Sequence, residues 1–213
     1  MLARSRLCSV LALLLVAPLF AAGCGARQPR VWVAPVVDLS RFGTLGMVEF
    51  TSRSGDGLGA LATREFMAAM QRAQPGTPVL ELGDERRLLA TLSRVELDTE
   101  AVRAIGEKHH LDALVVGVLE PAIVQPKLAF DAGAPWMSAS AKLESTLSTR
   151  ILDTHSGATL WSSSTHARAD VGTVEFSANG VSSAGASQPN EARLTLVRRL
   201  VSGATEDFRG YWN

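Results

Sequence analysis

The stretch that most constrains the fold is LDALVVGVL, residues 111–119, because nearly all of its residues are apolar. A strand with one wet face alternates apolar and polar residues, and this stretch does not. An unbroken apolar run of this length is typical of a strand that helices cover on both faces. The run therefore predicts a sheet with helices packed on both sides.

The residues before this run predict most of the elements that would surround it. Patterns of apolar residues predict strands over residues 44–50 (TLGMVEF) and 78–82 (PVLEL), with a helix over 58–74 between them. Asp84 and Asp98 each precede a segment with helical periodicity, and aspartate is a preferred helix cap. This order alternates strands and helices, which is typical of a parallel sheet.

The residues after the run predict an antiparallel hairpin. Over 139–151, apolar or small residues alternate with polar ones, which indicates a half-buried strand. The turn residues 153–157 (DTHSG) then lead into a partner strand over 159–169. A hairpin joined to the strands above makes the predicted sheet mixed, with parallel and antiparallel neighbours.

The remaining segments complete the predicted organisation. Residues 24–42 form a tether and extended arm, in which VWV at 31–33 is a candidate edge strand. The small and polar composition of residues 177–189 predicts a flexible loop, and Asn190 is the expected cap of a last helix. The sequence therefore predicts one α/β domain over 43–213, with a mixed, partly parallel sheet flanked by helices and a C-terminal helix.

The first 23 residues have the composition of an export signal. Arg4 and Arg6 precede an apolar run over residues 7–22, which ends in small residues. As a helix this run would span about 24 Å, less than the roughly 30 Å hydrocarbon core of a bilayer. We therefore expect residues 1–23 to be a signal peptide that is removed.

Cys24 is the candidate modification site. The chain has two cysteines, and Cys8 lies in the expected signal peptide, so Cys24 would have no disulfide partner afterwards. A lone thiol without a histidine cluster is also a poor metal site. The sequence AAGC resembles the lipobox of bacterial lipoproteins, which implies cleavage between Gly23 and Cys24 and acylation of Cys24. The alternative is an ordinary secretory signal that leaves an unused thiol.

The lipobox resemblance also implies a location. Two or more acyl chains anchor a protein stably at a membrane surface. Gly25 follows the cysteine, in the position where an aspartate retains enteric lipoproteins in the inner membrane. The resemblance therefore implies lipid anchoring, palmitate included, in the outer membrane with the domain facing the periplasm.

Composition and motifs predict no nucleic-acid partner, no metal and no cofactor. Basic and acidic residues number 21 each, which disfavours a nucleic-acid binder that relies on counterion release. His109 and His110 are adjacent, so on a helix they point about 100° apart and cannot face one ion. They are expected at the end of a helix, near its negative dipole.

One motif leaves an enzymatic alternative open. GDGLGA, residues 55–60, loosely matches a dinucleotide-binding fingerprint, and Glu81 sits near the end of the next predicted strand. In a nucleotide fold the glycines follow the strand directly, whereas residues 51–54 intervene here. A nucleotide-dependent enzyme that uses Gly55, Gly57 and Glu81 is therefore only the third hypothesis, and no catalytic residue is predicted.

Two signatures carry a resemblance to a known group of proteins. They are LDALVVGVL at 111–119 and ILDTHSGATLW at 151–161, together with the TLGMVEF strand and the cysteine at position 24. With these features the chain resembles the periplasmic lipoproteins of the curli-secretion-channel superfamily, over about residues 43–170. That superfamily includes the penicillin-binding-protein-activating lipoproteins and is similar in fold to the amino-terminal domain of TolB.

The resemblance implies two functions. Activator-type members dock on an envelope protein, which implies a non-enzymatic binding module in envelope assembly or secretion that uses an edge strand or the 177–189 loop. Curli-type members form oligomeric outer-membrane pores, so an export-channel subunit, and with it a homo-oligomer, is the alternative. Pore hairpins need an apolar side, whereas the strand predicted over 159–169 is mostly Ser, Thr and Ala, and no second inserted hairpin is predicted. We therefore favour the binding module.

Overall fold

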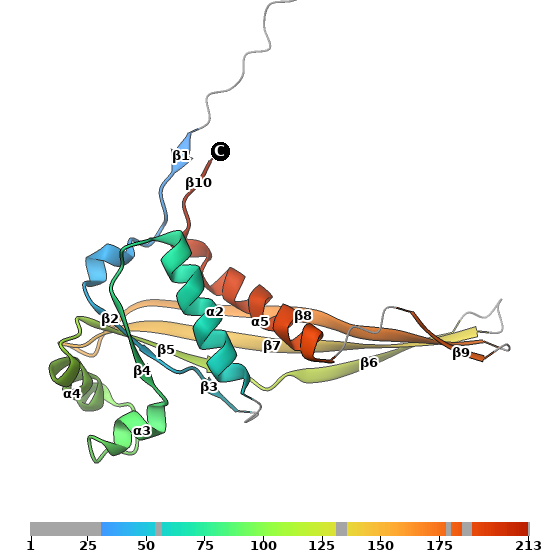
Figure 1. The fold of residues 1–213 in the computed structure, drawn as a ribbon, viewed down its shortest axis with the longest axis horizontal. Helices are drawn as coiled ribbons and strands as arrows, with labels where there is room; N and C mark the ends of the chain where they lie inside the picture. The colour runs from blue at the N-terminus through green and yellow to red at the C-terminus, as the bar shows by residue number, and fades with distance from the viewer. Residues whose placement is uncertain (1–30, 54–56, 131–135, 178–179, 185–188, 213) are drawn as a thin grey trace, which may run out of the picture. The chain divides into compact units, whose positions relative to one another are not determined.

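The computed structural model describes residues 31–53, 57–130, 136–177, 180–184 and 189–212 (Figure 1). These residues fall into two units, one of Ala34–Tyr211 and a smaller one that contains residues 31–33 and Trp212. The strands of the large sheet are β2 (Leu45–Val48), β3 (Thr51–Ser52), β4 (Val79–Gly83), β5 (Ala113–Leu119), β6 (Ile123–Phe130), β7 (Trp136–Asp153), β8 (Thr159–Ser177) and β9 (Gly180–Ala184). The helices are η1 (Leu39–Phe42), α2 (Leu58–Ala73), α3 (Glu85–Ala90), α4 (Thr99–His109), α5 (Pro189–Ala204) and η2 (Glu206–Phe208). Two short strands, β1 (Trp32–Val33) and β10 (Tyr211–Trp212), form a separate ribbon.

The large sheet is mixed, as the sequence predicts. Its strand order is β4-β2-β5-β7-β8-β9, with β3 beside β5 and β6 beside β7. β2 lies parallel to both β4 and β5, whereas β7 is antiparallel to β5, β6 and β8. The predicted α/β class, with a hairpin in the C-terminal half and a C-terminal helix, is confirmed.

Strand β5 is covered on both faces, which confirms the prediction from its unbroken apolar run. Ala113 and Val115 belong to one hydrophobic cluster, together with residues of α2 and α5. Leu114 and Val116, at the alternate positions, belong to a second cluster with residues of α3 and α4. Successive residues of a strand point to opposite faces, so the two clusters lie on opposite sides of the sheet.

A line of aromatic rings runs through the first cluster. The ring centroids of Phe50 and Phe66 are 5.2 Å apart, and those of Phe66 and Phe208 are 6.1 Å apart. Trp161 on β8 completes the line, with its ring 4.7 Å from that of Phe208. These contacts join a strand end, α2, η2 and β8, so the C-terminal segment is part of the core.

The indole of Trp161 also makes a polar contact that predicts a measurable contribution to stability. Its Nε1 donates a hydrogen bond to Oδ2 of Asp207 over 3.0 Å, beside a ring that is 9% exposed. We expect Trp161→Phe, which keeps an aromatic ring but removes the donor, to lower the free energy of unfolding by about 1–2 kcal/mol. Urea unfolding of Trp161→Phe, Asp207→Ala and the double variant measures the coupling. Strictly additive losses would contradict this assignment.

Two capping predictions are confirmed and one is wrong. Oδ1 of Asp98 accepts from the amide of Ala101 over 2.7 Å at the start of α4. Asp84 caps α3 in the same way, through the amide of Arg87 at 3.0 Å. The last helix instead begins at Pro189, so Asn190 lies inside it and is not its cap. A proline at the first helical position has its φ already set for a helix, which explains the earlier start.

The segment predicted as a loop over 177–189 differs most from expectation. Residues 180–184 form β9, which pairs with residues 173–177 of β8. β8 itself runs to Ser177, well past the predicted end at residue 169, because its partner β7 extends back to Trp136. Pairing with a neighbouring strand has therefore overridden a composition typical of loops. Residues 178–179 and 185–188 of the predicted loop lie outside the described residues.

Candidate functional site

The predicted modification site lies outside the described residues. Gly23 and Cys24 both fall within residues 1–30, so cleavage and acylation at that position stay predictions. Across the part of the chain that the structure describes, no helix is long and apolar enough to cross a membrane.

The structure does not gather the residues of the nucleotide hypothesis into one site. Gly55 lies outside the described residues, and Gly57 precedes α2 with a left-handed φ of 73°. Gly57 borders a hollow of about 230 Å³, whereas Glu81 on β4 borders a different one of about 210 Å³. The glycine and the carboxylate that would hold one cofactor thus border two neighbouring hollows and not the same one.

The charges at the start of α2 also disfavour a phosphate. A helix N-terminus attracts anions, yet three acidic residues, Glu49, Asp84 and Glu85, border the hollow there and only one basic residue, Arg86, does. Like charges within a few ångströms repel an added anion. Gly59, next in the motif, lies against the backbone, since a Cβ there would collide with the carbonyl oxygen of Phe50. Close packing of α2 on the sheet therefore accounts for this glycine.

The histidines are spread over the end of α4, the β7–β8 turn and β8. α4 ends at His109, and His110 follows it in a left-handed conformation with its amide donating to the carbonyl of Gly106. The prediction that these two residues lie at the end of a helix is confirmed. Among the described residues, no group of three or more His, Cys, Asp or Glu side chains could hold a metal ion. His155 lies in the β7–β8 turn and His166 lies in β8.

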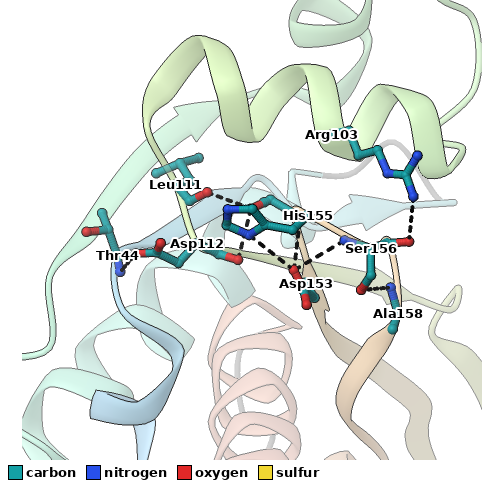
Figure 2. A network of polar contacts seen from close by, with 9 residues as sticks. Thr44, Arg103, Leu111, Asp112, Asp153, His155, Ser156 and Ala158 are labelled. Atoms are coloured by element: carbon teal, nitrogen blue, oxygen red, sulfur yellow. Dashed lines mark hydrogen bonds and ion pairs between the residues drawn. The ribbon is translucent and has the colours of Figure 1, made fainter.

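The DTHSG turn is a structural clamp (Figure 2). Oδ1 of Asp153 accepts from the amides of His155, at 2.7 Å, and Ser156, and the first of these bonds is the main cause that lowers the pKa of this carboxyl. The hydroxyl of Thr154 donates to the carbonyls of Leu111, at 2.6 Å, and Asp112. This side of the motif therefore fixes the turn against the start of β5.

Asp112 connects the turn network to the start of β2. Its Oδ2 accepts from the amide of Thr44, at 2.7 Å, just before β2 begins. The network in Figure 2 thus joins the starts of β2 and β5 to the β7–β8 turn. Asp112, Asp153 and Thr154 all take part in these contacts. A structural role is therefore enough to explain the polar residues of the ILDTHSGATLW signature.

The feature left without a structural explanation is the far end of the large sheet. Strand β5 pairs with β7 only over residues 147–153. Beyond that point β6 pairs with residues 137–144 of β7, and β9 pairs with residues 173–177 of β8. We call these four strands, with β7 from residue 136 to 146 and β8 from 165 to 177, the sheet extension. In Figure 1 it continues past the first residues of α5.

The sheet extension consists of two β-hairpins side by side, β6–β7 and β8–β9. The sequence predicts a single hairpin and no second inserted one, and this prediction is wrong. β6 and β9 are its outer strands, and each pairs on one side only within the described residues. Unpaired strand edges present N–H and C=O groups that another strand can bind.

The register of the sheet extension sorts its residues into alternating rows. The mainly apolar rows are Val124–Leu143–Ala169, Pro126–Ala141–Gly172, Leu128–Ala139–Val174–Ser183 and Phe130–Met137–Phe176–Val181. The mainly polar rows between them are Ile123–Glu144–Arg168, Gln125–Lys142–Asp170, Lys127–Ser140–Thr173–Ala184 and Ala129–Ser138–Glu175–Ser182. Alternate rows of a pleated sheet belong to opposite faces, so Leu143 and Ala169, in one row, lie on the other side of the sheet from Glu144 and Arg168, in the next.

The base of the sheet extension shows how each face begins. Leu143 and Ala169, from the first apolar row, are buried in the cluster that α5 covers. On the other face, Oε1 of Glu144 lies 2.6 Å from Nε of Arg168, and Nζ of Lys142 lies 3.7 Å from Oδ1 of Asp170. At its base, the sheet extension therefore joins the core on one side and carries ion pairs on the other.

No protein-family model matches the chain, and no curated protein sequence matches it. A comparison with solved structures finds several that resemble this chain. Lipoprotein GNA1162 from Neisseria meningitidis is 16% identical, with a TM-score of 0.38 over 60% of this chain and 83% of that one. The PelC dodecamer from Paraburkholderia phytofirmans is 9% identical, with a TM-score of 0.39 over 84% and 96%. The LpoB C-terminal domain from Salmonella enterica is 10% identical, with a TM-score of 0.37 over 63% and 95%.

Proposed function

We propose that this chain is a non-enzymatic lipoprotein, anchored through acylated Cys24 in the outer membrane and facing the periplasm, that binds an envelope protein through its sheet extension. The observation that carries the proposal is the pair of outer strands, β6 and β9, each paired on one side only among the described residues. A partner strand can add to such an edge through main-chain hydrogen bonds. The signal-like leader and the lipobox-like AAGC support the anchor.

The polar residues that stand out in the sequence support the absence of an enzymatic role. Asp112, Asp153 and Thr154 are engaged in the clamp, and the carboxylates at the start of α2 disfavour a phosphate ligand. The sheet extension, by contrast, continues past the last residue of β7 that pairs with β5. Its outer edges are therefore available for a partner strand.

A second candidate is a subunit of an oligomeric outer-membrane export channel. The alternation of apolar and polar rows favours it, because a membrane-crossing sheet needs one apolar face and strands of about 9–11 residues. Residues 136–146 of β7 have that length. Pairing β6 of one copy with β9 of the next would be a head-to-tail contact, which closes into a ring when the rotation allows. In this candidate the partner strand belongs to another copy of the chain.

Cross-linking in the native envelope distinguishes these two candidates. The binding module predicts a reproducible adduct whose added mass is not a multiple of this chain, and the acylated protein sediments in detergent as a monomer or dimer. The channel subunit predicts adducts at multiples of this chain and a single large closed ring. The absence of any reproducible adduct and of any ring would contradict both candidates.

Placing a charged residue in an outer strand tests which edge is bound. We expect Val181→Lys, in outer strand β9, to remove the adduct or the ring, because charged side chains block edge-to-edge pairing. Val95→Lys is the matched control, since Val95 is 93% exposed in the segment between α3 and α4. Equal cross-linking in the two variants would show that β9 is not the binding edge.

A further inference from the structure

The small unit holds a cluster of exposed apolar side chains. Trp32 of β1 and Trp212 of β10 lie with their ring centroids 5.2 Å apart, yet they are 50% and 64% exposed. Val31, beside Trp32, is 59% exposed. The other tryptophan whose side chain the structure describes, Trp161, is buried in the core. We call Val31, Trp32 and Trp212 the aromatic ribbon.

We propose that the aromatic ribbon lies in the headgroup region of the membrane that holds the acyl chains. Tryptophan has an apolar body and an N–H donor, and it is enriched at membrane–water interfaces for that reason. A ribbon with two residues in each strand is too short to be stable by itself in water. Insertion into an interface would provide the apolar contacts that are missing.

The distance along the chain from Cys24 favours the membrane as the occupant. This step depends on the proposed lipid anchor. Seven residues, 25–31, lie between Cys24 and Trp32, and a fully extended chain of that length reaches about 25 Å. With the acyl chains of Cys24 in the leaflet, Trp32 stays within reach of the headgroups whatever path these residues take.

The charge of the segment before the aromatic ribbon also favours a membrane surface. Residues 24–33 carry Arg27 and Arg30 and no acidic residue. Basic residues beside a membrane anchor are attracted to anionic lipids, by roughly 1 kcal/mol each. A basic segment that leads into exposed tryptophans is thus complementary to an anionic lipid surface.

Depth-dependent fluorescence quenching tests the proposal. The acylated, full-length mature protein is reconstituted into vesicles of phosphatidylethanolamine and phosphatidylglycerol, with bromine placed on the acyl chain either near the glycerol or near the methyl end. We expect quenching of tryptophan emission that is stronger with bromine near the glycerol. The double variant Trp32→Phe/Trp212→Phe is expected to lose most of that quenching, while the control Val95→Ser keeps it.

Each other outcome has a distinct meaning. A protein that stays in the aqueous phase of a detergent phase partition lacks the lipid anchor, and the inference falls with its premise. A protein that enters the detergent phase but is not quenched, or is quenched equally in the double variant, keeps its anchor and overturns the inference alone. A smaller sedimentation coefficient of the double variant in detergent would show that a second copy covers the aromatic ribbon, which also overturns it.

Discussion

Replacing Cys24 with serine is expected to abolish both processing and acylation of the chain. The lipobox-like site implies that cleavage follows modification of the thiol, so the variant should keep residues 1–23 and carry no lipid. Each buried methylene contributes roughly 0.8 kcal/mol to membrane binding, so losing two or more acyl chains removes anchoring of this kind entirely. Intact-mass spectrometry of the purified protein measures both changes, whereas fractionation alone would not, because an uncleaved apolar leader also holds a protein at a membrane.

The chain supplies a matched control for this experiment. Cys8→Ser changes the other cysteine, inside the expected leader, and should give the same cleaved and acylated product as the natural sequence. An ordinary secretory signal predicts a different result: Cys24→Ser would still be cleaved, and the natural protein would have the mass of an unmodified chain. That result would remove the lipid anchor from the proposed function.

The second large effect is expected from truncating the central ring of the core. Phe66 on α2 is fully buried and lies between the rings of Phe50 and Phe208. Phe66→Ala removes a whole aromatic side chain and leaves a cavity, which costs about 3–5 kcal/mol in comparable cores. Domains of this size have a total stability of about 5–15 kcal/mol. The midpoint of urea unfolding should therefore fall sharply with little change in slope.

Two further variants make this prediction decisive. Val95→Ala, at a position that is 93% exposed, should change the free energy of unfolding by no more than about 0.5 kcal/mol. If Phe66→Ala does not accumulate as a folded protein, Phe66→Leu, which keeps most of the volume, should fold with a loss of about 1–2 kcal/mol. An unfolding midpoint for Phe66→Ala equal to that of Val95→Ala would contradict the placement of Phe66 in the core.

The parts of the fold that were predicted correctly are those in which local pattern and burial agree. The apolar run of β5 requires covering on both faces, and the sheet provides it. Asp84 and Asp98 precede helices because their carboxylates accept the first free amides, a purely local effect. The turn after Asp153 likewise forms from bonds between residues that are neighbours in sequence.

The sheet extension was missed because its pattern depends on neighbours that the sequence alone does not identify. In β6, Pro126 is a signal against a strand, yet an outer strand tolerates proline on its unpaired side. β9 has the small and polar composition of a loop and becomes a strand by pairing with β8. The alternation of Val124, Leu128 and Phe130 with Gln125 and Lys127 could have indicated β6.

The candidate site was predicted even less completely. Local composition suffices to predict a modification at Cys24, whereas the edges of β6 and β9 exist only through pairing at long range. Trp32 and Trp212 are 180 positions apart in the sequence, and no local pattern relates them. Interaction surfaces of this kind are products of the tertiary fold, whereas a processing site must be readable before the chain folds.

The position of β2 between β4 and β5 imposes an order on folding. Leu45 is paired with Val79 and with Ala113, and the amide of Thr44 donates a hydrogen bond to the carboxylate of Asp112. A chain that emerges from its N-terminus cannot pair β2 on both sides until residues far downstream have also emerged. Topologies with such non-local pairing fold slowly. β2 therefore stays unpaired with β5 until residue 113 has emerged, and we expect the yield of folded protein to fall in cells depleted of chaperones that bind unpaired apolar segments.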